Sequence, residues 1–358
     1  MMLRPRIIAR SQLSLALFGL TLGLFLVEMT TRALVICNHS LEPMVPAAIG
    51  RFDERFGWSL RPYASASSRR SGQKINYRIN SKGLRDTEMN YEKPRGIFRI
   101  VLLGDSNTFG HGVPVEKHFS TLLERRFSNV EVVNMGVGGY GVDQELLYLQ
   151  QEGFRYNPDL VLTYVPHYAD QRHMHSNRFG RDKPRFVLNG EQLTLTNYPV
   201  PYNLPLPRAL LPIHSWCVSQ SKLCELLHLR GAAFIKDSSH VLSNIRQAST
   251  EGPSSLSITR PESDTRELGA RIVTEIGDEC RKRAVSFALV TRIGSLHEAL
   301  ARNGHKSLEV SRALASDKFK IPNDNHDNEA ANDVLASEIG RFLQTSNLLP
   351  PEHWHIPD

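Results

Sequence analysis

A serine, and a histidine with a carboxylate two residues before it, are the groups in this chain best suited to covalent chemistry. Ser106 belongs to Gly104-Asp105-Ser106, which directly follows the apolar run Ile100–Leu103. An apolar run that stops at such residues predicts a buried strand ending in a tight turn. The hydroxyl would then lie at the carboxyl edge of a sheet, where open α/β sheets bind ligands. By itself, however, the tripeptide is more typical of an ordinary turn.

Two later segments offer the groups that a reactive serine needs, namely a base, a residue that orients the base, and donors for an oxyanion. Asp324-Asn325-His326 precedes the last apolar-faced helix, so His326 could point back at the sheet edge while Asp324 fixes its tautomer. An Asp-x-His in a polar loop is nevertheless more often exposed to solvent. The glycines of Asn134–Gly141 would let a backbone N–H approach an oxyanion, although they also suit a flexible turn.

Alternating strand and helix patterns would position these groups. Strand patterns alternating with helical ones predict an α/β fold with a mostly parallel sheet and right-handed crossovers. The expected strands are 98–103, 130–134, 160–165 and 285–290, and the expected helices are 119–127, 144–154, 265–283 and 328–343.

The remainder of the chain divides around this core. We expect an N-terminal segment 1–37, a polar lead-in 38–97, a main domain 98–346 and a tail 347–358. Within the lead-in, Ser65–Ser71 is predicted to be an exposed loop, and Tyr77–Asp86 a short strand followed by a glycine turn. Residues 171–260 are rich in proline, carry a helical patch near 219–229, and are predicted to be an insertion over the active edge of the sheet.

The N-terminal segment allows three interpretations: a cleaved signal peptide, an uncleaved membrane anchor or a core helix. An uncharged stretch, Ser11–Val27, follows Arg4, Arg6 and Arg10, and apolar residues resume after Glu28 and Arg32, which are spaced to pair. No convincing small-x-small cleavage site follows. The arginines before the span favour a cytoplasmic N-terminus and an exported body. The uncleaved anchor is therefore the preferred interpretation.

Composition excludes several other classes. The net charge is +6, but the basic residues are scattered, so we expect no nucleic-acid partner. No lysine of a phosphate-binding loop follows Gly104, and no Gly-x-Ser-x-Gly motif occurs. The four cysteines have no metal-ligand spacing. Cys217 and Cys224 would lie about 10 Å apart along one helix, so no structural disulfide is expected.

In order and spacing these segments resemble the SGNH/GDSL hydrolase superfamily. Gly104-Asp105-Ser106 resembles its first block, with Ser106 as nucleophile. Asn134–Gly141 resembles the second, where Gly139 matches the oxyanion glycine, and Asp324-x-His326 before Asn328 resembles the fifth, which supplies acid and base. Asn80–Glu88 is similar to the lead-in of membrane-anchored bacterial members. The resemblance covers roughly 75–170 and 268–343 and implies a three-layer, flavodoxin-like α/β/α sandwich.

The chain departs from the family pattern at two places. Many members have the acid three residues before the histidine, where this chain has Asn323; the spacing of Asp324 matches relatives that include polysaccharide O-acetyltransferases. In the third block, Ala169 stands where an oxyanion asparagine is usual, while Asp170 is kept. His167 could substitute as the donor. Asp170 with His173 and His175 suggests a metal site only faintly, and none is expected.

The resemblance implies a serine hydrolase that cleaves acyl esters through an acyl-serine intermediate and needs no cofactor. Ser106 would attack, His326 would act as base, Asp324 would orient it, and the N–H groups of Ser106 and Gly139 would bind the oxyanion; Asp105 has no assigned role. Its substrate would be an acyl ester, with an acylated glycan as one candidate. The location implied is the bacterial inner membrane, with a single span and a periplasmic domain. Two alternatives remain open: an O-acyltransferase acting on an envelope or exported polysaccharide, and a non-catalytic relative that binds glycans or proteins.

Overall fold

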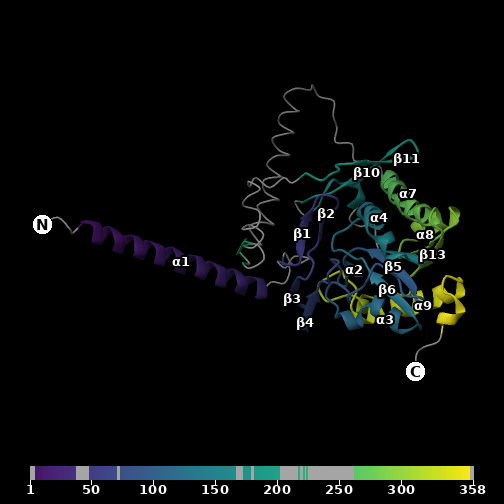
Figure 1. The fold of residues 1–358 in the computed structure, drawn as a ribbon, viewed down its shortest axis with the longest axis horizontal. Coiled ribbons are helices and arrows are strands. Elements are labelled where there is room, and N and C mark those ends of the chain that lie inside the picture. The colour runs from purple at the N-terminus through teal and green to yellow at the C-terminus, as the bar shows by residue number, and fades with distance from the viewer. Residues whose placement is uncertain are drawn as a thin grey trace, which may run out of the picture. The chain divides into compact units, whose positions relative to one another are not determined.

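The structure is a computed structural model that describes residues 5–37, 48–70, 73–166, 172–178, 181–201, 217, 221, 223–224 and 262–354. The chain forms two compact units (Figure 1). One comprises residues 1–43 with 204–243, and the other comprises 44–203 with 244–358.

The larger unit is built on a five-stranded parallel sheet, as the alternating sequence pattern predicts. The strand order is β13-β12-β7-β5-β6. After β5 the chain continues to β6, which lies on one side of the central pair β5 and β7. After β7 it continues to β12, which lies on the other side of that pair. At such a reversal, a crevice opens at the carboxyl ends of the strands. The strands are β5 Phe98–Gly104, β6 Val130–Asn134, β7 Leu160–Val165, β12 Ser286–Thr291 and β13 Lys306–Glu309.

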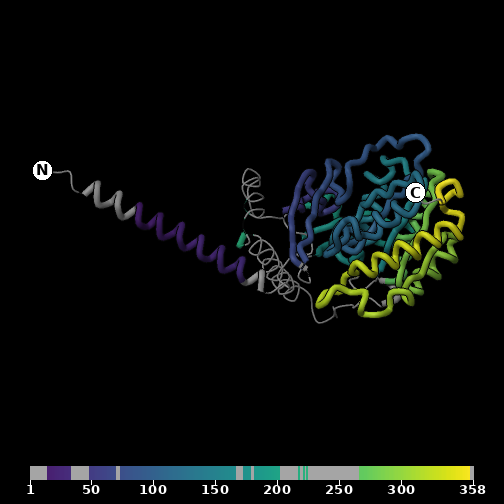
Figure 2. Tube along the Cα trace, turned by 90° about the horizontal axis from the view of Figure 1, so that it is seen from below, coloured from purple at the N-terminus to yellow at the C-terminus, as the bar shows by residue number. Residues whose placement is uncertain are grey.

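Helices cover both faces of this sheet, so the expected three-layer α/β/α sandwich is confirmed (Figures 1 and 2). Alternate residues of β5 face opposite layers: Val101 and Leu103 belong to one core cluster, and Ile100 and Leu102 to the other. The first cluster includes residues of α4 Val142–Gln151, α7 Glu262–Arg281 and α8 Gly294–Arg302. The second includes residues of α3 Phe119–Arg125 and α9 Glu329–Thr345.

The lead-in contains two antiparallel hairpins. β1 Gly50–Asp53 pairs with β2 Gly57–Leu60, and β3 Ser65–Arg70 pairs with β4 Gln73–Arg78. The prediction of a loop was therefore wrong for residues 65–70, although Ser65, Ser67 and Arg69 are exposed as expected. β4 carries Ile75 and Tyr77, which are buried at alternate positions, and the serine-rich segment completes its ladder of backbone hydrogen bonds.

The described part of the predicted insertion begins with two hairpins attached to the sandwich. β8 Asn177–Arg178 pairs with β9 Arg181–Asp182, and β10 Arg185–Asn189 pairs with β11 Gln192–Thr196. Between them the ammonium group of Lys183, fully buried, forms an ion pair with Asp143 of α4. A charge buried this deeply requires such a partner. Most of the helical patch expected near 219–229 lies outside the described residues.

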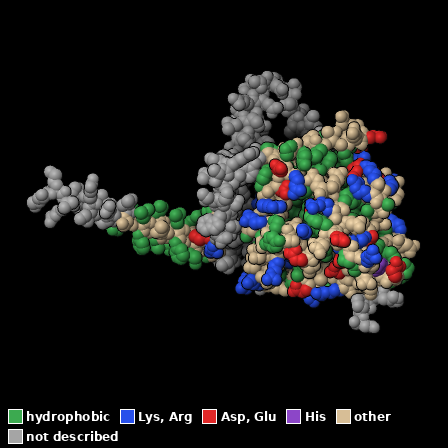
Figure 3. Space-filling view, in the orientation of Figure 1, with side chains coloured by type: hydrophobic (Ala, Val, Ile, Leu, Met, Phe, Trp, Pro, Cys, Tyr) green, Lys and Arg blue, Asp and Glu red, His purple; other side chains and the backbone are tan. Residues whose placement is uncertain are grey.

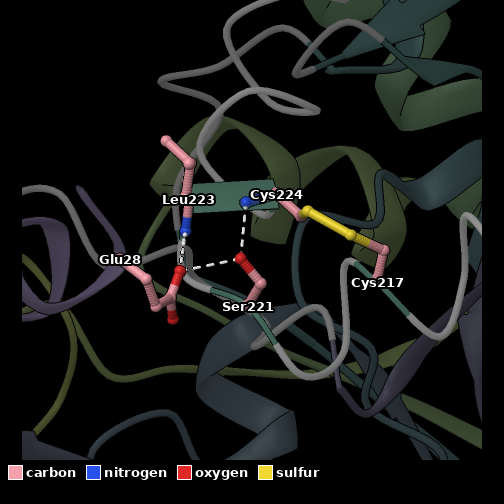
Figure 4. The surroundings of a disulfide bond; sticks show 5 residues. All are labelled: Glu28, Cys217, Ser221, Leu223 and Cys224. Carbon is pink, nitrogen blue, oxygen red and sulfur yellow. Dashed lines mark hydrogen bonds between the residues drawn. A yellow bond between two sulfur atoms is a disulfide. The ribbon is translucent and has the colours of Figure 1, made fainter. Parts of the chain in front are cut away.

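A disulfide joins Cys217 and Cys224, contrary to the sequence-based expectation (Figure 4). Their Cα atoms are 6.0 Å apart, within the range a disulfide requires. The expectation assumed one continuous helix, but Ser221 between them is not helical. Its N–H donates to the carbonyl of Cys217, and its hydroxyl accepts from the N–H of Cys224. The chain therefore turns at Ser221 and brings the two cysteines together.

An apolar helix, α1 Pro5–Cys37, forms the N-terminal part of the smaller unit. Within it, Ser14–Ala33 is long and apolar enough to cross a membrane, and a signal sequence would have the same properties. Its large side chains are exposed, Leu15 by 74% and Phe18 by 68% (Figure 3). Glu28 pairs with Arg32, as their spacing predicts, and accepts hydrogen bonds from Ser221 and Leu223 (Figure 4).

Candidate active site

Ser106, His326 and Asp324 form one hydrogen-bonded chain. The Nε2 atom of His326 lies 2.8 Å from the hydroxyl oxygen of Ser106. The Nδ1 atom of the same ring contacts a carboxylate oxygen of Asp324, which also accepts the backbone N–H of His326 at 3.1 Å. An ionised carboxylate only accepts, so Nδ1 carries the proton and Nε2 is available to accept one from the serine. The three residues selected from the sequence thus meet with the polarity that proton abstraction requires.

Ser106 occupies the sharp turn between β5 and the short helix α2 Ser106–Phe109. Asp105 is the N-cap of this helix, and its carboxylate accepts the N–H of Asn107 at 2.8 Å. Gly104 is required for close packing, because a Cβ there would lie 2.0 Å from the hydroxyl oxygen of Thr108. The Gly-Asp-Ser turn therefore presents Ser106 at the carboxyl end of β5.

Two buried side chains support the helix after Ser106. Arg85, from the lead-in, donates to the carbonyls of Phe109, Gly110 and Val113. Burial lowers the pKa of Arg85 to about 10, which leaves it charged at neutral pH. His118 donates from Nε2 to the carbonyl of Asn107 at 3.0 Å, and burial lowers the pKa of His118 to about 3, so it stays neutral.

The loop that carries Asp324 and His326 is fixed by the next residue, Asp327. Its carboxylate, which is 3% exposed, accepts from Arg292 at 2.6 and 2.7 Å, from Lys320 at 2.9 Å and from the Tyr164 hydroxyl at 3.0 Å. The N–H of Asp327 donates to the side-chain oxygen of Asn107 at 3.0 Å. Asp327 therefore connects the histidine loop to β7, to the end of β12 and to the nucleophile helix.

The glycine loop Asn134–Gly141 packs directly against the Gly104-Asp105-Ser106 turn. The N–H of Val137 donates to the carbonyl of Gly104 at 3.2 Å. At Gly136, a Cβ would lie 2.2 Å from the nitrogen of Phe109, so the two backbones touch. Gly139 has a φ of +85°, a conformation that glycine adopts without strain. The loop predicted to supply an oxyanion donor thus lies beside Ser106's turn.

Arg172 connects the turns that carry the two predicted oxyanion donors. One guanidinium nitrogen donates to the Asp105 carboxylate at 2.8 Å and to the carbonyl of Tyr140 at 2.9 Å. Asp105 immediately precedes Ser106, and Tyr140 immediately follows Gly139. The side chain of Arg172 is 9% exposed. Sequence reasoning missed this residue, because an arginine in a polar segment after β7 gives no periodic signal.

A second histidine, which sequence analysis missed, lies beside Asp324 and His326. His111 is 3% exposed, and its Nε2 atom is 3.6 Å from the second carboxylate oxygen of Asp324. The rings of His111 and His326 have centroids 4.4 Å apart. Burial would raise the pKa of Asp324, but the contacts with His111 and His326 outweigh burial and hold that pKa well below its usual range.

Three candidates from the third block, His167, Ala169 and Asp170, lie outside the described residues, so their predicted roles stay untested. Of the histidines near them, His173 is buried and His175 is exposed. Within the described part of the chain, the group of side chains that could hold a metal ion is His111, Asp324 and His326.

No protein-family model and no curated protein matches this sequence. Among solved structures, the chain is similar to a lipase/acylhydrolase from Enterococcus faecalis, with 15% identity and a TM-score of 0.37 over 70% of this chain and 97% of that one. It is also similar to a psychrotrophic esterase from Pseudoalteromonas sp., with 11% identity and a TM-score of 0.38 over 70% and 99%. An acetyl xylan esterase aligns with 11% identity and a TM-score of 0.36 over 70% and 100%. At these values the likeness assigns no activity to this chain.

The lowered pKa of Asp324 predicts a pH-dependent contribution to stability. A carboxyl whose pKa is lowered by folding stabilises the fold fully above its unfolded-state pKa of about 3.9, and this contribution is lost as the pH falls toward the folded-state value. We expect wild type to exceed Asp324→Asn in free energy of unfolding most at neutral pH, and by less at about pH 3. Urea unfolding across this range measures the difference. Asp317→Asn, an exposed carboxylate on the same loop, is the control, and a pH-independent difference for Asp324→Asn would contradict the prediction.

Proposed function

We propose that this chain is an SGNH/GDSL-type serine hydrolase that cleaves acyl esters. The observation that carries the proposal is the 2.8 Å contact between the Ser106 hydroxyl and Nε2 of a histidine whose Nδ1 is bound to Asp324. The order of the motifs supports it, because these residues occupy the positions that match the first and fifth blocks of that superfamily. A hydrogen-bonded triad also favours an enzyme over the non-catalytic binder.

In this mechanism, the Ser106 oxygen attacks the ester carbonyl while its proton passes to Nε2 of His326. The oxyanion receives hydrogen bonds from the backbone N–H groups of Ser106 and Gly139. The tetrahedral intermediate collapses, His326 returns the proton to the leaving alcohol, and an acyl-serine remains. His326 then takes a proton from water, whose oxygen attacks the acyl carbonyl. The second tetrahedral intermediate collapses, His326 returns this proton to the Ser106 oxygen, and the acid is released.

An O-acyltransferase acting on an envelope or exported polysaccharide is the second candidate. The spacing of Asp324 before His326 favours it, since relatives with this spacing include polysaccharide O-acetyltransferases. The same acyl-serine would form, and a sugar hydroxyl would replace water in the second step. An acylated glycan is a substrate common to both candidates.

We further propose that the larger unit lies outside the cytoplasm of a bacterium, anchored in the inner membrane by α1. Arg4, Arg6 and Arg10 precede the apolar span, which favours a cytoplasmic N-terminus. The Cys217–Cys224 disulfide supports the same orientation, because disulfides persist in oxidising compartments such as the periplasm.

The triad predicts that Ser106→Ala and His326→Ala each remove nearly all hydrolysis of short acyl esters, on the order of a thousandfold or more. The reason is that these residues act as a unit, so the loss of either blocks proton transfer. Steady-state hydrolysis of a chromogenic acetyl ester measures the effect, and a fluorophosphonate probe should label wild type but not Ser106→Ala. Ser337→Ala and His297→Ala, on α9 and α8, are matched controls that should retain activity. Activity of Ser106→Ala within a few-fold of wild type would rule out the serine nucleophile.

Arg172 predicts a loss of turnover without a matching loss of substrate affinity. Arg172→Met removes the link between the Asp105 and Tyr140 segments, so the two oxyanion donors should no longer be aligned. We expect kcat to fall by about ten- to a hundredfold with little change in KM, because the oxyanion contacts form chiefly in the transition state. Arg172→Lys should restore part of kcat. Arg155→Met, at an exposed arginine, is the control. Equal changes in kcat for the Met and Lys variants, or an effect confined to KM, would contradict this positioning role.

The proposed topology predicts that a reporter enzyme active only in the periplasm is active when fused after Asp358. The full-length chain should also stay with membranes after a high-salt wash, since the apolar face of α1 is embedded rather than bound by charge. Reporter activity and fractionation measure the two properties. Replacing Arg4, Arg6 and Arg10 by glutamate provides a comparison that should weaken the orientation bias. Full-length protein recovered from the soluble cytoplasm would refute the anchor.

A further inference from the structure

The acid of the triad and the two histidines beside it are arranged like the ligands of a metal ion. His111, Asp324 and His326 each offer one ligand atom, and these atoms all lie within 4.8 Å of one another. The residues come from two separate segments, the loop after α2 and the loop before α9. Two imidazoles and one carboxylate are a donor set that suits Zn²⁺ and related divalent transition metals.

The spacing of His111 and Asp324 is close to that of two ligands on one metal ion. Their Nε2 and Oδ2 atoms are 3.6 Å apart, which is beyond the range of a good N–H···O bond. Two ligands at about 2.1 Å from one tetrahedral zinc ion are about 3.4 Å apart. Nδ1 of His326 and a carboxylate oxygen of Asp324 are in direct hydrogen-bond contact, so the His326 ring and the carboxylate must move apart to admit an ion between the three groups.

The surroundings also suit an ion that enters from solvent. The side chain of His111 is 3% exposed, that of His326 11% and that of Asp324 21%, so one ligand is buried and two lie at the surface of the site. An ion there would be bound by one buried side chain and two that are partly exposed.

We propose that His111, Asp324 and His326 form an inhibitory site for a zinc-like divalent cation. The inhibition, though not the binding, rests on the function proposed above. An ion on Nδ1 of His326 would displace the proton that this nitrogen carries, and the neutral ring would carry its proton on Nε2 instead. The Nε2 atom would then donate to Ser106 rather than accept from it, and the serine would have no base. The metal thus switches the enzyme off by fixing the wrong tautomer, while Ser106 itself remains intact.

Binding is tested first, without catalysis, on full-length Ser106→Ala protein in detergent, which keeps all three ligands. Isothermal titration with ZnCl₂ should show one site per chain, and Co²⁺ should give the visible absorption of a low-symmetry site with nitrogen ligands. In the Ser106→Ala background, the additional substitution His111→Phe, which keeps a ring in the same space, should weaken zinc binding at least about tenfold. Adding His297→Phe, a histidine on α8, should leave the affinity unchanged. His111→Gln is the second variant if the phenylalanine variant does not fold, with thermal unfolding as the check.

Inhibition is tested next on the protein with Ser106 present, with each variant compared with its own rate in a chelator. Zinc should inhibit wild type reversibly, and EDTA should restore the rate. The half-inhibitory zinc concentration should rise at least about tenfold in His111→Phe and not in His297→Phe. Absence of zinc binding by Ser106→Ala, or binding that is unaffected by His111→Phe, would overturn the proposal. Zinc binding that depends on His111 in a chain with no ester-cleaving or transferring activity would leave the site in place and refute the proposed function instead.

Discussion

The geometry of the site depends on one buried carboxylate, that of Asp327. It is the acceptor at which Arg292, Lys320 and Tyr164 meet, and its own N–H reaches Asn107 in the nucleophile helix. His326 is its immediate neighbour in the chain, so the direction of the imidazole follows from this anchor. Removing one member of such a buried charged group commonly costs about 3–5 kcal/mol, because the remaining charges lose their partners. Asp327 therefore stabilises the fold and the site by the same contacts.

The strand ends of the sheet place Ser106 and the glycine loop at one edge. Segments outside the sheet hold the turns that follow these strands in position. Arg85 from the lead-in binds the carbonyls after α2, and Trp58 of β2 donates to the carbonyl of Gly138. Arg172, from the start of the predicted insertion, bonds both turns beside Ser106 and Gly139. The lead-in and the start of the insertion therefore hold the turns of the site in place by direct hydrogen bonds.

Much of this arrangement could be predicted from the sequence, for identifiable reasons. Strands β7 and β12 and the end of β5 are apolar runs, and Ser106, Asp324 and His326 lie at the ends of elements whose order can be predicted. Arg172, His111 and Asp327 could not be found, because their partners are far away in the sequence and their own segments are polar. The short edge strand β13 and the helix α8 have no strong pattern. The disulfide was missed because a break in a helix at one serine, Ser221, is not visible in the spacing of the cysteines.

The contact between Ser106 and His326 joins residues 220 positions apart. Chains are made from the N-terminus, so the turn with the serine is complete long before its partner histidine exists. Under the proposed mechanism, a growing chain that ends before the loop at Lys320 lacks the base that Ser106 requires. Under the proposed mechanism, the reactivity of Ser106 therefore depends on the later of the two segments, the loop that carries Asp324 and His326.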